Sequence, residues 1–169
     1  MTPIINYLSD DENPAEILAL VKEARSNLII RAFKGVVPMT LESKLTILEN
    51  LIELANAAKV PNERLFADPS LVHISTGMGQ EHLLNTYESI VVLNQMIEPP
   101  LNSIVWLSSI TTGLPKTLKS IVASTYLSYL AGAGLHAALV NVNDETVMKS
   151  IYLIKSFRDE IVFTPADIM

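Results

Sequence analysis

The chain has 169 residues, about the size of one domain. Its 49% hydrophobic and 18% charged residues exclude an intrinsically disordered protein, and its formal charge of -6 argues against a nucleic-acid binder. The lack of cysteine excludes disulfide scaffolds, thiolate metal sites and cysteine nucleophiles.

Short apolar runs alternate with amphipathic segments along the chain. They predict strands at 4–8, 28–32, 64–68, 102–108 and 137–142, and helices at 15–25, 41–59, 79–97, 116–130 and 145–157. We expect Ser9, Asp10, Thr40 and Asp144 to cap helices. Because the strands are continuously apolar, they predict a parallel sheet in an α/β fold.

The strand starts recur every 24 to 38 residues. A closed eight-stranded barrel needs about 250 residues, or about 31 for each βα unit. The chain therefore holds five such units. This spacing fits both an open doubly wound sheet and part of a (β/α)8 barrel.

Residues 120–143 carry no charge and are long enough to span a bilayer. Their hydroxyl groups and glycines favour a buried helix followed by a buried strand. The N-terminus shows no basic region followed by a long apolar stretch, so we expect no secretory signal, no membrane partner and a cytoplasmic location.

Polar residues follow the predicted strands at the edge where parallel α/β folds bind ligands. Amide and hydroxyl groups can hydrogen-bond a heterocycle, and a carboxylate can accept a guanidine-like N–H pair. No glycine-rich phosphate loop is present. The set therefore favours a flat, polar small molecule, and it consists of Asn6, Arg31, Lys34, Asp68, Ser108, Ser109, Thr111, Asn141, Asn143 and Asp144.

Several of these residues have a structural alternative. Asn6 and Asp68 could satisfy their own turns, and Arg31 could either face an anion or pair with a carboxylate. Trp106 lies within an apolar strand and is expected in the core. The three histidines are too far apart in sequence to indicate a metal site, and no metal is expected.

Five stretches stand out in chain order: Ile5-Asn6 with Ser9-Asp10-Asp11, Glu63 to Pro69, Gly79 to His82, Leu107 to Ser109, and Ala131 to Ala138. Together they resemble the pterin-binding (dihydropteroate synthase-like) TIM-barrel family, and within it the methyltetrahydrofolate:corrinoid/iron–sulfur protein methyltransferases. The resemblance runs from Pro3 to about Asp159. It implies a partial (β/α)8 TIM barrel, in which residues 1–169 form one domain with strands four to eight and without the first three βα units.

The resemblance also implies a pterin site. Asn6 and Asp68 match the pterin-binding Asn and Asp of the family. Ser109 replaces an Asn that lies near the transferred methyl group, so it is the candidate catalytic residue as well as a pterin contact. Asn141 stands where the family often has Asp and is the fourth pterin contact that the resemblance implies. An Arg expected shortly after Ser109 is missing.

The activity implied by the resemblance is transfer of a methyl group from N5 of 5-methyltetrahydrofolate to a corrinoid carried by a separate partner protein. This chain itself would hold no metal. A second chain completing the barrel, or a homodimer, is an implied partner. Two alternatives stay open: a non-catalytic pterin-binding or interaction subunit, and a truncated inactive fragment.

Overall fold

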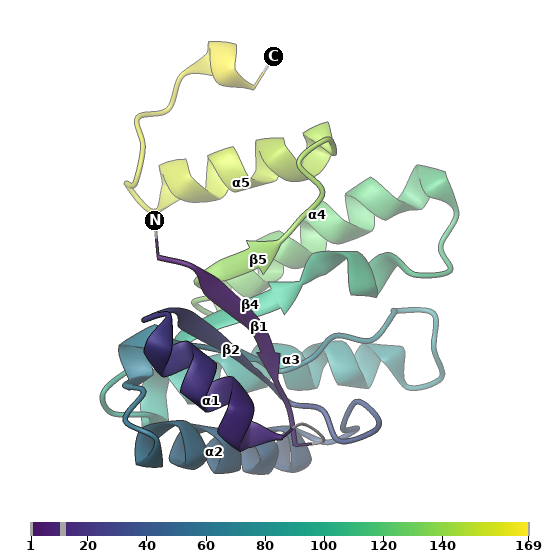
Figure 1. Cartoon of the computed structure of the whole chain (residues 1–169). Coiled ribbons are helices and arrows are strands. Elements are labelled where there is room, and N and C mark those ends of the chain that lie inside the picture. The colour runs from purple at the N-terminus through teal and green to yellow at the C-terminus, as the bar shows by residue number, and fades with distance from the viewer. Residues whose placement is uncertain (1, 11–12, 169) are drawn as a thin grey trace.

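The computed structural model describes residues 2–10 and 13–168 and shows one parallel sheet in the order β1-β2-β3-β4-β5 (Figure 1). The strands are β1 (Ile4–Leu8), β2 (Asn27–Arg31), β3 (Leu65–Asp68), β4 (Asn102–Trp106) and β5 (Ala137–Leu139). The helices are α1 (Pro14–Glu23), α2 (Leu41–Ala57), α3 (Gly79–Met96), α4 (Lys116–Gly132) and α5 (Glu145–Phe157). Short 3-10 helices occupy Asn62–Arg64, Leu107–Thr111 and Pro165–Asp167.

The sheet curls into half of a barrel, and the helices lie around its outer side (Figure 1). Two apolar clusters join strands to helices. One packs α1 and α2 against β1 to β3 through residues such as Leu28 and Leu48, and the other packs α4 and α5 against β4 and β5 through residues such as Val105 and Leu127. The partial-barrel prediction is confirmed.

Strand register separates the outer face from the inner face. Leu28 and Leu65 are register partners and belong to the outer core. Because successive side chains of a strand point to opposite faces, the register pairs one and three residues further along these strands face inward. Arg31 and Asp68 are such a pair. The curl is strong enough that Tyr7 of β1 and Trp106 of β4 make an edge-to-face contact, with ring centroids 6.5 Å apart.

The last two strands are shorter than predicted. β4 ends at Trp106, and the chain continues as the 3-10 helix Leu107–Thr111, while β5 ends at Leu139. The uncharged stretch 120–143 forms most of α4 followed by β5, as expected. Among the helices of residues 2–10 and 13–168, none has the length and apolar character that crossing a bilayer requires.

Helix capping was predicted correctly at two helices and incorrectly at one. Thr40 accepts from Ser43 N–H at 3.2 Å, and Asp144 accepts from Val147 N–H at 3.2 Å. The cap of α1 is Asn13 instead of Ser9 or Asp10, because Pro14 begins the helix and fixes the cap one residue before it.

Candidate functional site

The candidate site lies on the inner face, where β2 and β3 end. Arg31 is the last residue of β2 and Asp68 the last residue of β3, and the two are register partners. Tyr7 from β1 and Trp106 from β4 complete the cluster with two aromatic rings. The curl of the sheet therefore gathers side chains from four strands at one place.

Asp68 is 1% exposed and has one oxygen without a hydrogen bond. Its Oδ1 accepts from Ser70 N–H at 2.8 Å, which confirms a turn-stabilising role. Its Oδ2 lies 3.3 Å from Arg31 Nε but receives no hydrogen bond from any described residue. Burial raises the pKa of this carboxyl to about 6, against the opposing effects of Arg31, the Ser70 N–H and Lys44. A buried acceptor is thus left available.

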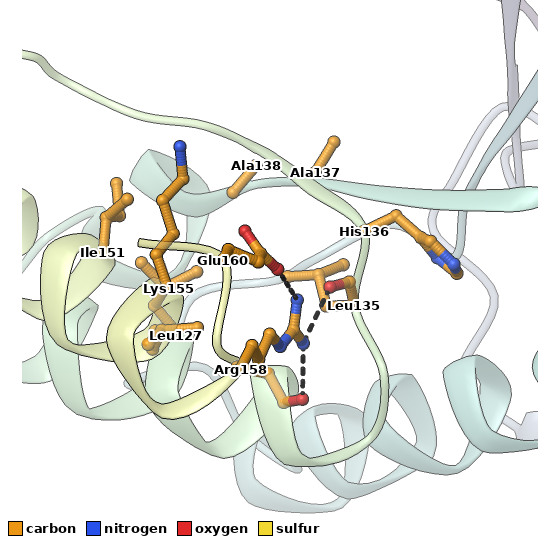
Figure 2. Close-up of a pocket in the computed structure, with 11 residues that line it drawn as sticks. Leu127, Leu135, His136, Ala137, Ala138, Ile151, Lys155, Arg158 and Glu160 are labelled. Carbon is orange, nitrogen blue, oxygen red and sulfur yellow. Dashed lines mark hydrogen bonds and ion pairs between the residues drawn. The ribbon is translucent and has the colours of Figure 1, made fainter. Parts of the chain in front are cut away.

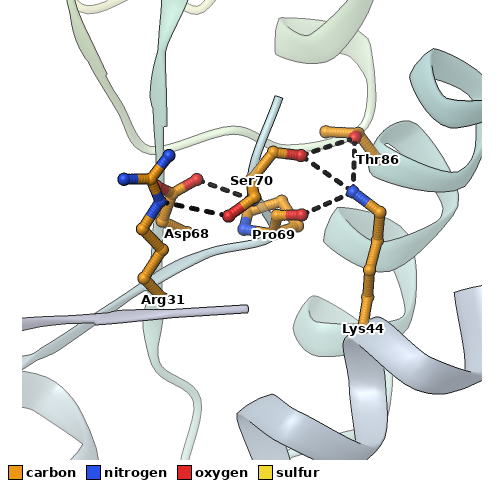
Figure 3. A network of polar contacts seen from close by, with 6 residues as sticks. All are labelled: Arg31, Lys44, Asp68, Pro69, Ser70 and Thr86. Atoms are coloured by element: carbon orange, nitrogen blue, oxygen red, sulfur yellow. Dashed lines mark hydrogen bonds and ion pairs between the residues drawn. The ribbon is translucent and has the colours of Figure 1, made fainter. Parts of the chain in front are cut away.

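Arg31 pairs with a carboxylate, which settles the choice that the sequence left open. Its Nε donates to Ser70 Oγ at 3.1 Å (Figure 3). Its guanidinium carbon lies 5.1 Å from the ring centroid of Tyr7 and 5.1 Å from that of Trp106. Distances of this kind are typical of cation–π contacts.

The core position expected for Trp106 is wrong. The residue is partly exposed and belongs to neither apolar cluster, and its ring faces Arg31 on the inner side of the sheet. A continuous apolar strand in a parallel sheet does not reveal which of its residues face inward, because both faces are largely covered.

Lys44 stabilises the turn that follows Asp68. It is fully buried in α2, and its Nζ donates to Pro69 O at 2.6 Å, to Ser70 O at 2.8 Å and to Thr86 Oγ1 at 3.3 Å (Figure 3). Burial lowers the pKa of Lys44 to about 8. Because Ser70 has a φ of +58°, these bonds hold a strained turn that presents Ser70 N–H to Asp68.

Lys44 was missed from the sequence, although a signal was present. It stands four residues before Leu48, so it lies on the buried stripe of α2. A lysine on such a stripe needs several hydrogen-bond acceptors, and the turn after β3 supplies them.

The four residues predicted to bind pterin are distributed over two areas. Asn6 is exposed and pairs in register with Ile29, so it shares the inner face with Asp68. Ser109 is partly buried in the 3-10 helix after β4, and Asn141 is exposed in the loop after β5. Their roles as pterin contacts stay predictions.

The Asn141 side chain already has a local partner. Its Oδ1 accepts from Asn143 N–H at 3.1 Å. It lines a 260 Å³ pocket together with Ser108, Ala123 and Val147, and the latter two residues belong to the cluster on the helix side of the sheet. This pocket is therefore separate from the inner face that holds Asp68.

A second pocket lies at the other end of the half barrel, between α4 and α5 (Figure 2). It has a volume of 310 Å³ and includes Arg158. However, Arg158 Nη2 donates to Ala131 O at 2.7 Å and to Leu135 O at 3.1 Å, which closes the end of α4. Its cation serves the fold, so this pocket is the weaker candidate.

Titratable groups elsewhere do not assemble into a metal centre. Within the described ranges, no group of three or more His, Cys, Asp or Glu side chains could hold an ion. His82 is buried, which lowers its pKa, and its Nε2 faces the Met39 sulfur. His136 Nδ1 lies 3.1 Å from Ser103 Oγ.

The fold and the location of this site define a partial (β/α)8 barrel, and solved structures share it. Dihydropteroate synthase (DHPS) of Yersinia pestis, solved with a pterine–sulfa conjugate, matches with a TM-score of 0.64 and 16% identity. The match covers 88% of this chain and 58% of that one. A dihydropteroate synthetase solved with a product matches with the same TM-score and identity, over 88% of this chain and 57% of its own.

These matches concern the fold. The chain spans a little under three fifths of the length of the two enzymes. No protein-family model matches the sequence, and no curated protein matches it.

Proposed function

We propose that the inner face binds the ring of a pterin, with Asp68 as the main acceptor. The observation that carries this proposal is the buried Oδ2 of Asp68, which receives no hydrogen bond from any described residue. A pterin presents a guanidine-like pair of N–H groups on its aminopyrimidinone edge. Two charge-assisted hydrogen bonds to one carboxylate give both affinity and orientation.

The surroundings of Asp68 suit a flat ring. Tyr7 and Trp106 offer aromatic surface, and Asn6 on the same face can hydrogen-bond further ring atoms. The likeness to a DHPS solved with a pterine conjugate supports the choice of a pterin over other flat heterocycles.

The more specific proposal is a methyltransferase. The ring of 5-methyltetrahydrofolate would place N5 near Ser109. The Ser109 hydroxyl would donate a hydrogen bond to N5 and so help to deliver the proton that N5 must gain as its methyl group leaves. The acceptor would be the corrinoid of a partner protein, whose cobalt attacks the methyl group. Asn141, which lies in the separate pocket after β5, would add at most a weak contact to the far edge of the ring. A DHPS-like reaction on a pterin, or pterin binding without turnover, are the alternatives.

A partner that completes the barrel belongs to this proposal. Within the described residues, β1 pairs only with β2 and β5 only with β4, so each presents one open edge. Open edges of parallel strands favour association. We expect the purified chain to form a dimer, or to bind a second chain, in light-scattering measurements; a monomer at all concentrations contradicts this part.

The test of pterin binding is a calorimetric titration of pterin into the wild type and into two Asp→Asn variants. Asp68→Asn should weaken pterin binding about 100-fold or more, because it removes the negative charge and replaces one of the two acceptor oxygens with an NH2 donor. Asp159→Asn, at an exposed position, is the matched control and should bind as the wild type does. If the wild type shows no binding at millimolar pterin, the proposal is wrong.

The methyltransferase proposal has its own test. With 5-methyltetrahydrofolate and a corrinoid acceptor, Ser109→Asn should raise the rate of methyl transfer, since an amide reaches further and donates two hydrogen bonds. An unchanged rate would contradict the position near N5.

A further inference from the structure

We infer that Arg31 competes with the pterin ring for Asp68 and thereby sets the affinity of the site. This inference rests on the pterin binding proposed above and deepens it. It follows from the position, the shape and the incomplete hydrogen bonding of the Arg31 guanidinium.

Arg31 stands directly against the group that the pterin would use. Its Nε is 3.3 Å from Asp68 Oδ2, and that oxygen is otherwise enclosed by protein. A ring that donates to Oδ2 needs the same space. Arg31 and the ring therefore cannot both occupy it.

The guanidinium also resembles the pterin edge chemically. Both are planar, both delocalise their electrons, and both carry N–H groups side by side. The guanidinium lies among three aromatic rings, those of Tyr7, Trp106 and Phe33, at 5.1, 5.1 and 5.6 Å from their centroids. Such a surrounding accepts a flat, electron-poor group, whether it belongs to the protein or to a ligand.

The contact between Arg31 and Asp68 is nevertheless incomplete. The single Nε–H donates to Ser70 Oγ, which leaves Asp68 Oδ2 without a hydrogen bond. Neither Nη1 nor Nη2 donates to any residue in the described part of the chain. A pterin edge can donate two hydrogen bonds where Arg31 donates none, so displacement of Arg31 is favourable.

Arg31 also has a route out of the site. Its side chain is 16% exposed, whereas that of Asp68 is 1% exposed. The cation can regain water when it leaves, and the carboxylate stays to receive the ligand. The cost of separating the pair reduces the affinity of the wild type for pterin.

The test compares pterin affinity in the wild type, Arg31→Met, Arg31→Lys and Lys22→Met. Lys22 is exposed on α1, so its variant removes one positive charge away from the site. The titration is run at about pH 8, because removal of Arg31 raises the pKa of Asp68 further and the carboxylate must be ionised.

Arg31→Met should bind pterin about tenfold more tightly than the wild type, and Lys22→Met should match the wild type. Arg31→Lys should lie between them, since its ammonium keeps the charge but not the planar shape. Equal affinity of the wild type and Arg31→Met, or weaker binding by Arg31→Met, overturns the competition while pterin binding stands. If neither protein binds pterin, the proposed function fails and the competition fails with it.

A second measurement applies if Arg31→Met does not fold by circular dichroism. The Nε–H proton of Arg31 gives an NMR signal in the wild type that is identified by its loss in Arg31→Lys. Saturation with pterin should shift this signal, because the hydrogen bond to Ser70 breaks. A signal that stays in place at saturation overturns the inference.

Discussion

The carboxyl ends of β2 and β3 differ from those of β4 and β5 in how their polar groups are arranged. At β2 and β3, Arg31 and Asp68 form a largely buried ion pair, and Lys44 holds the turn at Pro69 and Ser70 that follows Asp68. At β5, Asn141 is neutral, exposed and bonded to its own loop. Binding energy should therefore concentrate at Asp68 and at the aromatic rings beside it, those of Tyr7 and Trp106. The loops that follow β4 and β5 should contribute little to affinity.

The largest effect should come from Lys44→Met, which removes the hydrogen bonds that hold the turn after β3. The substitution leaves the buried carbonyl of Pro69 without its donor and removes the shorter of the two hydrogen bonds to Ser70 O, which keeps only that from Thr86 Oγ1 at 3.3 Å. We expect the free energy of unfolding to fall by about 3 kcal/mol in urea denaturation, because these are charge-assisted bonds in a buried place. A change as small as that of the exposed Lys22→Met would contradict the role assigned to Lys44.

A pH series examines the charge on Asp68. The proposed binding of pterin would need the ionised carboxylate, and burial raises the pKa of Asp68 to about 6. Affinity should be constant well above that pH. Below it, affinity should fall about tenfold, or about 1.4 kcal/mol, for each pH unit. Affinity that is independent of pH between about 5 and 8 would show that Asp68 is not the acceptor.

Asn6→Ala should have a smaller effect. Asn6 lies on the same face as Asp68 but is exposed, so the proposed hydrogen bond to the ring would compete with water. We expect a loss in pterin affinity of about fivefold, or about 1 kcal/mol, in calorimetry. A loss as large as that of Asp68→Asn would make Asn6 an equal partner and weaken the comparison.

The smallest effect should come from Asn141→Ala. The Asn141 side chain is bonded to Asn143 N–H and lines the pocket on the helix side. Pterin affinity should change by less than about twofold. A loss of about tenfold or more would show that the ring extends to the end of β5, and the contrast between the two areas would then be wrong.

Much of the fold followed from the sequence because hydrophobic periodicity is a local signal. The order of five βα units, the cap at Thr40 and the strand that ends at Asp68 were all predicted. Pro14 is a local signal of the same kind, since a proline at the first helical position places the cap of α1 at Asn13.

The parts of the site that were missed depend on distant residues. The partner of Arg31 lies 37 positions away in Asp68, and the acceptors of Lys44 are 25, 26 and 42 positions away. The inward orientation of Trp106 depends on strand parity, which a continuously apolar strand conceals. The pterin contacts at Asn6, Asp68, Ser109 and Asn141 came from a family resemblance, and they stay predictions until a ligand is observed.

The most direct measurement of the central claim is a crystal structure of the chain grown with pterin. We predict that the ring lies on the inner face, that two of its N–H groups are about 2.8–3.0 Å from the Asp68 carboxylate, and that the Arg31 guanidinium has moved away. A ring bound in the Arg158 pocket or beside Asn141, with the contact between Arg31 and Asp68 intact, would contradict the account.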